Sequence, residues 1–113
     1  MELIDIHREG AVPVVVPRVK RLDASVAPAF KQQVAQLVQG GERRLLVDLA
    51  GVDFLDSSGL GALVSILKAL GSQGTMAVCG AHGGVLSLFK LTRMDKVFAI
   101  HADRPEALAR MGA

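Results

Sequence analysis

Val52-Asp-Phe-Leu-Asp-Ser-Ser-Gly-Leu-Gly-Ala-Leu-Val-Ser-Ile-Leu67 is a stretch in which one apolar segment passes through an acid and two adjacent serines into a second apolar segment. The second segment places large apolar residues at the spacing of one helix face: Leu60, Leu63, Val64 and Leu67. This spacing predicts a helix directly after the serines, and Gly71 or Gly74 can end it. The serines therefore lie where a strand is expected to pass into a helix.

The segments on both sides of this stretch alternate between expected strands and expected helices. Leu45-Leu-Val-Asp-Leu49 is a nearly continuous apolar run, which is typical of a central strand covered by helices. Met76-Ala-Val-Cys79 predicts the next strand, and Val97 to Ile100 predicts the last one. A short third helix is expected after Gly83-Gly84, and Asp103-Arg-Pro105 has the residues that begin a terminal helix.

The amino-terminal part predicts a strand pair followed by a helix. The β-prone runs Leu3 to Ile6 and Val12 to Val16 are separated by Arg8-Glu-Gly10, so we expect a hairpin or a close strand pair. Ser25 is the expected cap of the first helix, and Gly40-Gly41 is its expected end. The apolar residues of this helix fall on one face: Phe30, Val34, Leu37 and Val38.

This alternation predicts an α/β fold with a mostly parallel central sheet, an antiparallel amino-terminal strand pair and about four helices. A chain of 113 residues, half of them hydrophobic, can bury one core, so we expect a single domain over residues 1–113. Ligands of such open sheets bind where strands end and helices begin. Asp53 to Ser58 lies at such a junction and is the candidate functional segment.

Composition excludes several classes of function. With 13 basic and 11 acidic residues, no Trp, no Tyr and four Phe, the chain lacks the charge and the stacking side chains expected of a nucleic-acid binder. No apolar run approaches the ~20 residues that cross a bilayer, so no membrane span is expected. The lone Cys79 allows no internal disulfide, and the Met1 to Ile6 start lacks the features of a signal peptide, so we expect a cytoplasmic protein.

The motifs of catalysis and of cofactor binding are also missing. Leu55 stands two residues before Ser57, where a hydrolase of the Gly-x-Ser-x-Gly type has glycine. Val64 occupies the place of the third glycine of a dinucleotide-binding turn, and there is no Walker motif. Cys79 and the three scattered histidines, His7, His82 and His101, lack the spacing of zinc ligands. We therefore expect no enzyme activity, no cofactor and no metal.

Asp56, Ser57 and Ser58 allow two interpretations. In the first, they only cap the following helix, a contribution worth ~1 kcal/mol that needs one residue. In the second, two serines followed by Gly59 leave a hydroxyl at the positive end of a helix, where a phosphate group would meet free amides. The residues by themselves favour capping alone.

The run from Leu45 to Leu67, with Arg44 before it, resembles the signature of the STAS family, specifically the bacterial anti-sigma-factor antagonists of the sporulation and stress-response type. Leu22-Asp-Ala24 and Leu91 to Phe98 are also similar to that family's pattern. The resemblance covers nearly the whole chain, and it implies a single STAS domain. Where the family usually has Gly-x-Leu-Asp, this chain has Lys20-Arg-Leu-Asp23.

The resemblance implies an antagonist that is a substrate and not an enzyme. The unmodified protein would bind a serine-kinase anti-sigma factor and release sigma factor, the kinase would phosphorylate Ser57, and a metal-dependent serine phosphatase would reverse the modification. Ser58 is the second choice of acceptor, and Asp23, Asp56, Ser58 and Gly59 would form the surroundings of the switch and the contact with the partner. The rival interpretation is a constitutive STAS subunit that docks on a transport ATPase or on a larger signalling assembly.

Three cations lie close to this expected switch: Arg18, Lys20 and Arg21. They allow two interpretations that the residues do not separate. The cations either form a solvated strand end or contact an acidic partner.

Overall fold

The computed structural model describes residues 2–112, which form a five-stranded sheet in the order β1-β2-β4-β6-β7. Its strands are β1 (Ile4–Glu9), β2 (Val12–Pro17), β4 (Arg44–Asp48), β6 (Thr75–Cys79) and β7 (Ala99–His101). β1 is antiparallel to β2, and every other neighbouring pair is parallel. The predicted fold class, a mostly parallel sheet with an antiparallel amino-terminal pair, is confirmed.

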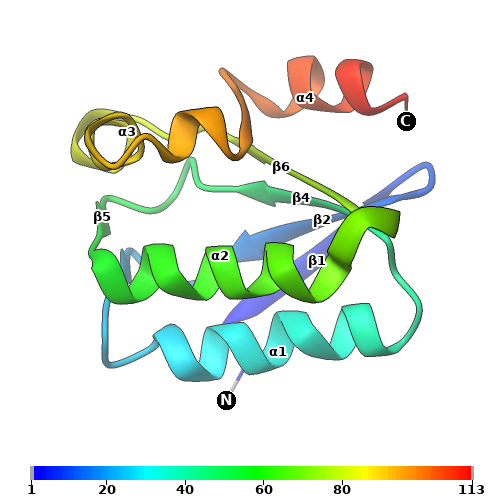
Figure 1. The fold of residues 1–113 in the computed structure, drawn as a ribbon, viewed down its shortest axis with the longest axis horizontal. Coiled ribbons are helices and arrows are strands. Elements are labelled where there is room, and N and C mark those ends of the chain that lie inside the picture. The colour runs from blue at the N-terminus through cyan, green and yellow to red at the C-terminus, as the bar shows by residue number, and fades with distance from the viewer. Residues whose placement is uncertain (1, 113) are drawn as a thin grey trace.

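Helices cover both faces of this sheet. The described residues form four α-helices, as expected: α1 (Ala27–Gln39), α2 (Ser57–Leu70), α3 (Gly83–Leu91) and α4 (Arg104–Met111). Figure 1 shows α1 and α2 side by side on one face and α4 on the other. The larger core lies with α1, α2 and α3 and includes Phe30 and Phe89, whereas a smaller apolar cluster that includes Leu46 and Ala107 lies under α4.

A second sheet of two very short strands stands beside the loops that precede α1 and α2. β3 (Arg21–Leu22) pairs in parallel with β5 (Phe54–Leu55). The sequence patterns did not predict this pair, because two residues are too few to show a period. The pairing fixes the segment before α1 against the segment before α2.

Three predicted boundaries are wrong. β1 continues through Arg8 and Glu9, which the sequence pattern places between the first two strands. The residue before α1 is Val26, which makes no side-chain capping bond, and the hydroxyl of Ser25 instead donates a hydrogen bond to Asp23. The last strand begins at Ala99 and not at Val97, because the amides of Val97 and Phe98 both donate to the carbonyl of Met94 and close a turn there. That turn follows a 3-10 helix, η2 (Met94–Lys96), while another, η1 (Gly71–Gln73), follows α2 at Gly71.

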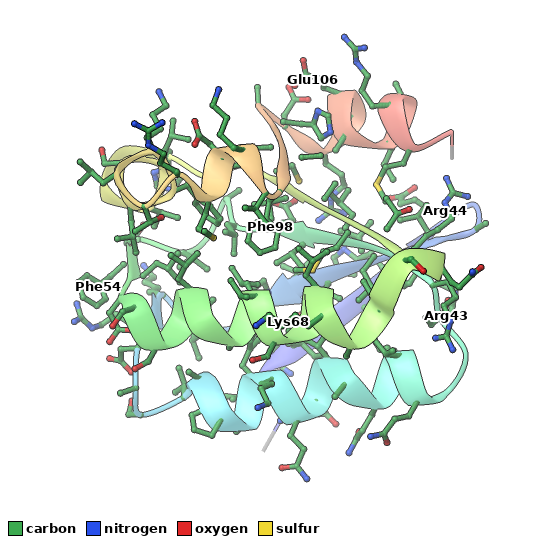
Figure 2. The ribbon with its side chains drawn as sticks, in the orientation of Figure 1. Arg43, Arg44, Phe54, Lys68, Phe98 and Glu106 are labelled. Carbon is green, nitrogen blue, oxygen red and sulfur yellow. The ribbon has the colours of Figure 1, made fainter. Side chains whose placement is uncertain are left out.

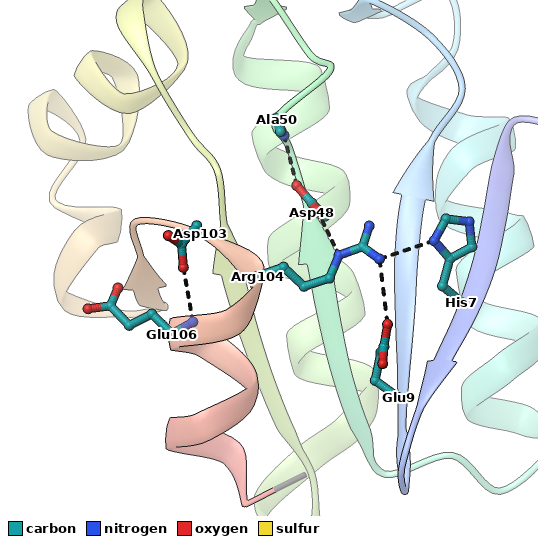
Figure 3. A network of polar contacts seen from close by, with 7 residues as sticks. All are labelled: His7, Glu9, Asp48, Ala50, Asp103, Arg104 and Glu106. Atoms are coloured by element: carbon teal, nitrogen blue, oxygen red, sulfur yellow. Dashed lines mark hydrogen bonds and ion pairs between the residues drawn. The ribbon is translucent and has the colours of Figure 1, made fainter.

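α4 is held to the sheet by a polar network around Arg104 (Figure 3). The Arg104 Nε atom donates to Asp48 Oδ2 at 3.0 Å, and its Nη1 donates to His7 Nδ1 at 3.1 Å. The same Nη1 lies 3.9 Å from Glu9 Oε2. One arginine at the start of α4 thus joins the helix to β1 and β4.

Candidate functional site

The amino end of α2 is capped by Asp56. The Asp56 backbone is extended, with φ −106° and ψ −174°, and its Oδ1 atom accepts a hydrogen bond from the amide of Gly59 at 2.9 Å. Its Oδ2 atom accepts one from the amide of Ala24 at 3.3 Å. One carboxylate therefore caps α2 and also ties it to the loop that precedes α1.

Ser57 and Ser58 are the first two residues of α2, and both are exposed. Neither hydroxyl hydrogen-bonds to another residue within the described range 2–112. Because Asp56 already supplies the cap, helix capping does not account for the serines. Their hydroxyls stand free at the positive end of the helix dipole.

The two serines differ in their surroundings. Ser58 lines a groove of about 360 Å³ between α1 and α2, together with Lys31, Ser65 and small residues such as Ala27 and Gly61. Ser57 is not among the residues that line this groove. Ser58 therefore lies along the groove, and Ser57 lies outside it.

Asp23 lies beside Asp56 because the β3–β5 pair brings their loops together, as the amide of Asp56 donates to the carbonyl of Leu22 at 3.4 Å. The Asp23 Oδ1 atom accepts hydrogen bonds from the Ser25 hydroxyl at 2.6 Å and from the Ser25 amide at 3.0 Å. The hydroxyl bond is the main reason why the pKa of Asp23 lies below its ordinary value, and the amide and Arg21 act in the same direction against partial desolvation. Asp23 is therefore an ionised group that shapes the loop next to the serines.

The cations of this loop have different partners. The Arg21 guanidinium carbon stands 4.0 Å from the centre of the Phe54 ring, and its Nε atom is 3.5 Å from Asp23 Oδ2. Arg18 pairs with Asp5 at 3.8 Å, whereas Lys20 has no carboxylate within 4 Å among the described residues. Figure 2 shows Phe54 projecting outward at the amino end of α2, where it is 38% exposed.

Gly59, the third residue of α2, is buried, so its part in this site is packing. A Cβ atom at this position would lie 2.2 Å from the carbonyl oxygen of Leu22 and 2.6 Å from a methyl group of Leu55. Only glycine allows α2 to approach β3 and β5 this closely. The sequence predicts Gly59 as one of the site residues, but it does not predict the close contact with Leu22 and Leu55 that requires glycine here.

The groups considered for catalysis or metal binding are placed elsewhere. His82 Nε2 is 3.1 Å from the carbonyl oxygen of Ala50, His7 bonds to Arg104, and no described histidine hydrogen-bonds to either serine. Cys79 lies in the cluster under α4, where burial raises the pKa of its thiol to about 12. Within residues 2–112, no group of three or more His, Cys, Asp or Glu side chains could hold a metal ion, and no helix is long and apolar enough to span a membrane.

The family model named STAS domain matches residues 4–107. The chain belongs to the STAS domain family. Among curated relatives, the anti-sigma-B factor antagonist of Staphylococcus aureus is 28% identical over 81 residues, which are 71% of this chain and 75% of that protein. Among solved structures, an anti-sigma factor antagonist from Mycobacterium paratuberculosis matches with a TM-score of 0.89 and 26% identity, and the match covers 97% of this chain and 93% of that chain.

The anti-sigma factor antagonist SpoIIAA shares the fold at lower identity. Its unphosphorylated form matches with a TM-score of 0.73 and 15% identity over 97% of this chain and 98% of its own. Its phosphorylated form, described as a Bacillus cell fate determinant, matches with a TM-score of 0.71 and 16% identity over 96% and 98%. This STAS domain thus has the fold of anti-sigma-factor antagonists, and α2 with its two serines is part of it.

Proposed function

We propose that this STAS domain is an anti-sigma-factor antagonist of a partner-switching pathway in which Ser57 is the phosphate acceptor. In its unmodified form the domain binds a serine-kinase anti-sigma factor, which releases sigma factor. Phosphorylation of Ser57 ends that binding, and a metal-dependent serine phosphatase restores it. The domain itself catalyses no reaction.

The proposal rests on the different roles of Asp56 and Ser57 at the start of α2. Asp56 supplies the helix cap with one carboxyl oxygen and holds Ala24 with the other. Ser57 is exposed, and its hydroxyl makes no hydrogen bond among the described residues, so the hydroxyl is accessible to a kinase. The relatives named anti-sigma factor antagonists, and the solved phosphorylated form of SpoIIAA, support a modification of this kind.

The free domain can tolerate the phosphate. At the first turn of α2 a dianion gains about 0.3–1 kcal/mol from the helix dipole, and repulsion from Asp56 cancels part of that gain. The folded state should therefore change little in stability.

The same phosphate acts strongly on an interface. A dianion pressed against a packed partner loses hydration, and the cost of an unpaired buried charge is several kcal/mol, which lowers affinity by ~100-fold or more. Asp23 and Asp56 beside the site carry negative charge and provide no counter-charge, and Arg21 is already engaged with Asp23 and Phe54.

Phosphosite mapping tests the proposal. The wild-type domain and its Ser57→Ala and Ser58→Ala variants are incubated with the cognate anti-sigma kinase and ATP, and the modified residue is located by mass spectrometry. We expect one phosphate on Ser57, none on Ser57→Ala, and normal modification of Ser58→Ala. Ser58→Ala is a matched control, because Ser58 is also exposed and stands at the next position of α2.

Two results would count against the proposal. Phosphate on Ser58 would move the acceptor into the groove that faces Lys31. No phosphorylation, together with stable binding of the domain to a transport ATPase or a larger assembly, would favour a constitutive subunit.

A further inference from the structure

The carboxyl end of α3 and the segment that joins it to β7 present apolar and basic side chains together. Leu91 is 82% exposed and Val97 is 51% exposed, the highest values among the exposed large hydrophobic residues of the described chain. Basic side chains are exposed around them. We define the 90–97 surface by five residues: Lys90, Leu91, Arg93, Lys96 and Val97.

The net charge of the chain is concentrated in this segment. Of the 13 basic and 11 acidic residues, three basic residues and one acidic residue, Asp95, lie between positions 90 and 97, which leaves ten of each sign elsewhere. None of the three cations has a carboxylate within 4 Å among residues 2–112. Other arginines do have such a partner: Arg8, Arg18, Arg21 and Arg104. The 90–97 surface is thus a basic patch without internal neutralisation.

Arg93 adds a second, independent observation. With φ 61° and ψ 20°, it is the single non-glycine residue with positive φ among the described residues. Glycine takes this conformation without the steric cost that a Cβ atom adds. Arginine at this strained position places a guanidinium among the residues of the patch, which points to a use for that side chain.

The backbone beneath the patch is well anchored. Phe89 and Phe98, which are 0% and 3% exposed, pack edge to face with ring centres 5.8 Å apart. The Thr92 hydroxyl donates to the carbonyl of Leu88 at 2.7 Å, and Met94 packs against the larger core. Leu91 and Val97 therefore stay outside on a fixed support, which lowers the ordering cost of binding.

We propose that the 90–97 surface binds an acidic, amphipathic segment of a partner protein. Carboxylates of the segment face Lys90, Arg93 and Lys96, and its apolar side chains cover Leu91 and Val97. Three cations fall short of the clusters of about four to eight basic residues that bind anionic lipid, so a protein segment fits better than a membrane surface. This binding goes beyond the proposed function, because it needs no phosphorylation of Ser57.

An amide-resolved NMR titration tests the proposal. The probe is a short blocked peptide in which Glu and Leu recur at helical spacing, and the control peptide has Gln in place of every Glu. We expect the acidic peptide to bind with a Kd of about 1 mM or tighter and to shift amides of residues 88–98. Added salt should weaken the binding, because the charges are exposed.

Variants separate the role of the side chains from that of the backbone. Arg93→Gly removes the cation and relieves the positive φ, so the melting temperature should stay equal or rise while affinity falls about five-fold. Leu91→Ser should also lower affinity without loss of stability, since Leu91 is 82% exposed. Lys68→Gln removes an exposed cation from α2 and is the matched control, for which we expect unchanged binding.

Other results would overturn the proposal. These are equal shifts from the neutral peptide, shifts outside residues 88–98, or binding that Arg93→Gly and Leu91→Ser leave unchanged. Binding of the domain to phosphatidylserine vesicles, lost in both variants while the peptide causes no shift, would assign the surface to a membrane instead. Ser57→Ala should titrate like the wild type, so failure of this proposal and failure of the Ser57 switch are distinguishable.

Discussion

The amino ends of α2 and α4 are built from the same cap but differ in the side chains they leave free. Asp56 and Asp103 both have extended backbones, and each accepts a hydrogen bond from the amide three residues later, at 2.9 Å and 3.0 Å. In α4, the next residue, Arg104, bonds to Asp48 and His7, and Glu106 accepts a bond from the amide of Ala102 at 2.7 Å. Its polar side chains are thus used within the molecule.

The start of α2 is arranged differently. Its first helical residues, Ser57 and Ser58, are exposed, and their hydroxyls have no hydrogen-bond partner among the described residues. Its third residue is Gly59, which packs against the carbonyl oxygen of Leu22. Capping is thus a local requirement that one aspartate meets at each helix. The residues after the cap decide whether a helix end is structural or available for chemistry.

The largest expected effect comes from Gly59→Ala. Its new methyl group would lie 2.2 Å from the Leu22 carbonyl oxygen, so α2 and β3 must move apart, at a cost of about 3 kcal/mol. Chemical denaturation measures this as a fall in the free energy of unfolding. Gly61→Ala is the control in the same helix, because nothing lies within 4 Å of its Cβ position, and it should stabilise by up to about 1 kcal/mol. Equal stability of the two variants would contradict the packing at the start of α2.

The next largest effect is expected at the amino end of α4. Arg104→Ala removes the hydrogen bond to Asp48, a partly buried carboxylate, and should lower the free energy of unfolding by about 2 kcal/mol. Arg110→Ala, on the exposed side of the same helix, should change it by no more than about 0.5 kcal/mol. Partner binding should be the same for both variants. A selective loss of binding in Arg104→Ala would show that α4 is not merely structural.

Removing each cap compares the two ends directly. Asp103→Ala and Asp56→Ala should each destabilise by about 1 kcal/mol, and Asp56→Ala should cost more, because its carboxylate also holds Ala24. Asp56→Asn should recover most of the stability. Binding to the anti-sigma partner, measured by calorimetry, should fall for Asp56→Ala alone. The same binding loss in Asp103→Ala would remove the distinction between the two ends.

The smallest effect is a pH dependence at Asp23. Because hydrogen bonds lower its folded-state pKa, its contribution to stability is complete above the ordinary value of 3.8 and is lost as the pH falls through the lowered pKa. Asp23→Asn should remove this component of acid denaturation while leaving the melting temperature at pH 7 nearly unchanged, since Asn can accept the bond from Ser25. A large drop of the melting temperature at pH 7 would contradict this limited role.

The fold class and the positions of both helix ends could be predicted from the sequence. The apolar runs of β4 and β6 and the helical spacing from Leu60 to Leu67 fix the fold class, because each pattern is long enough to be recognised. The terminal helix, with Asp103 as its cap, is also as predicted. The junction at Asp56 could be located from the order of these elements alone.

The rest depends on contacts between distant segments. The β3–β5 pair, the hydrogen bond from Ala24 to Asp56 and the close approach at Gly59 all join residues more than 30 positions apart. The partners of Arg104 on β1 and β4 are equally remote in sequence. Local patterns do not encode such contacts, so the sequence left open which of Asp56, Ser57 and Ser58 was the cap.

The role of Ser57 is decided by the affinity of the anti-sigma partner for the unmodified domain and for the domain that carries phosphate on Ser57, with the melting temperature of each form. We predict that phosphorylation lowers affinity by ~100-fold or more, while the melting temperature changes by no more than about 3 °C. Equal affinities of the two forms, or a phosphorylated domain that has lost its fold, would contradict the account of Ser57 as a switch acting on the interface.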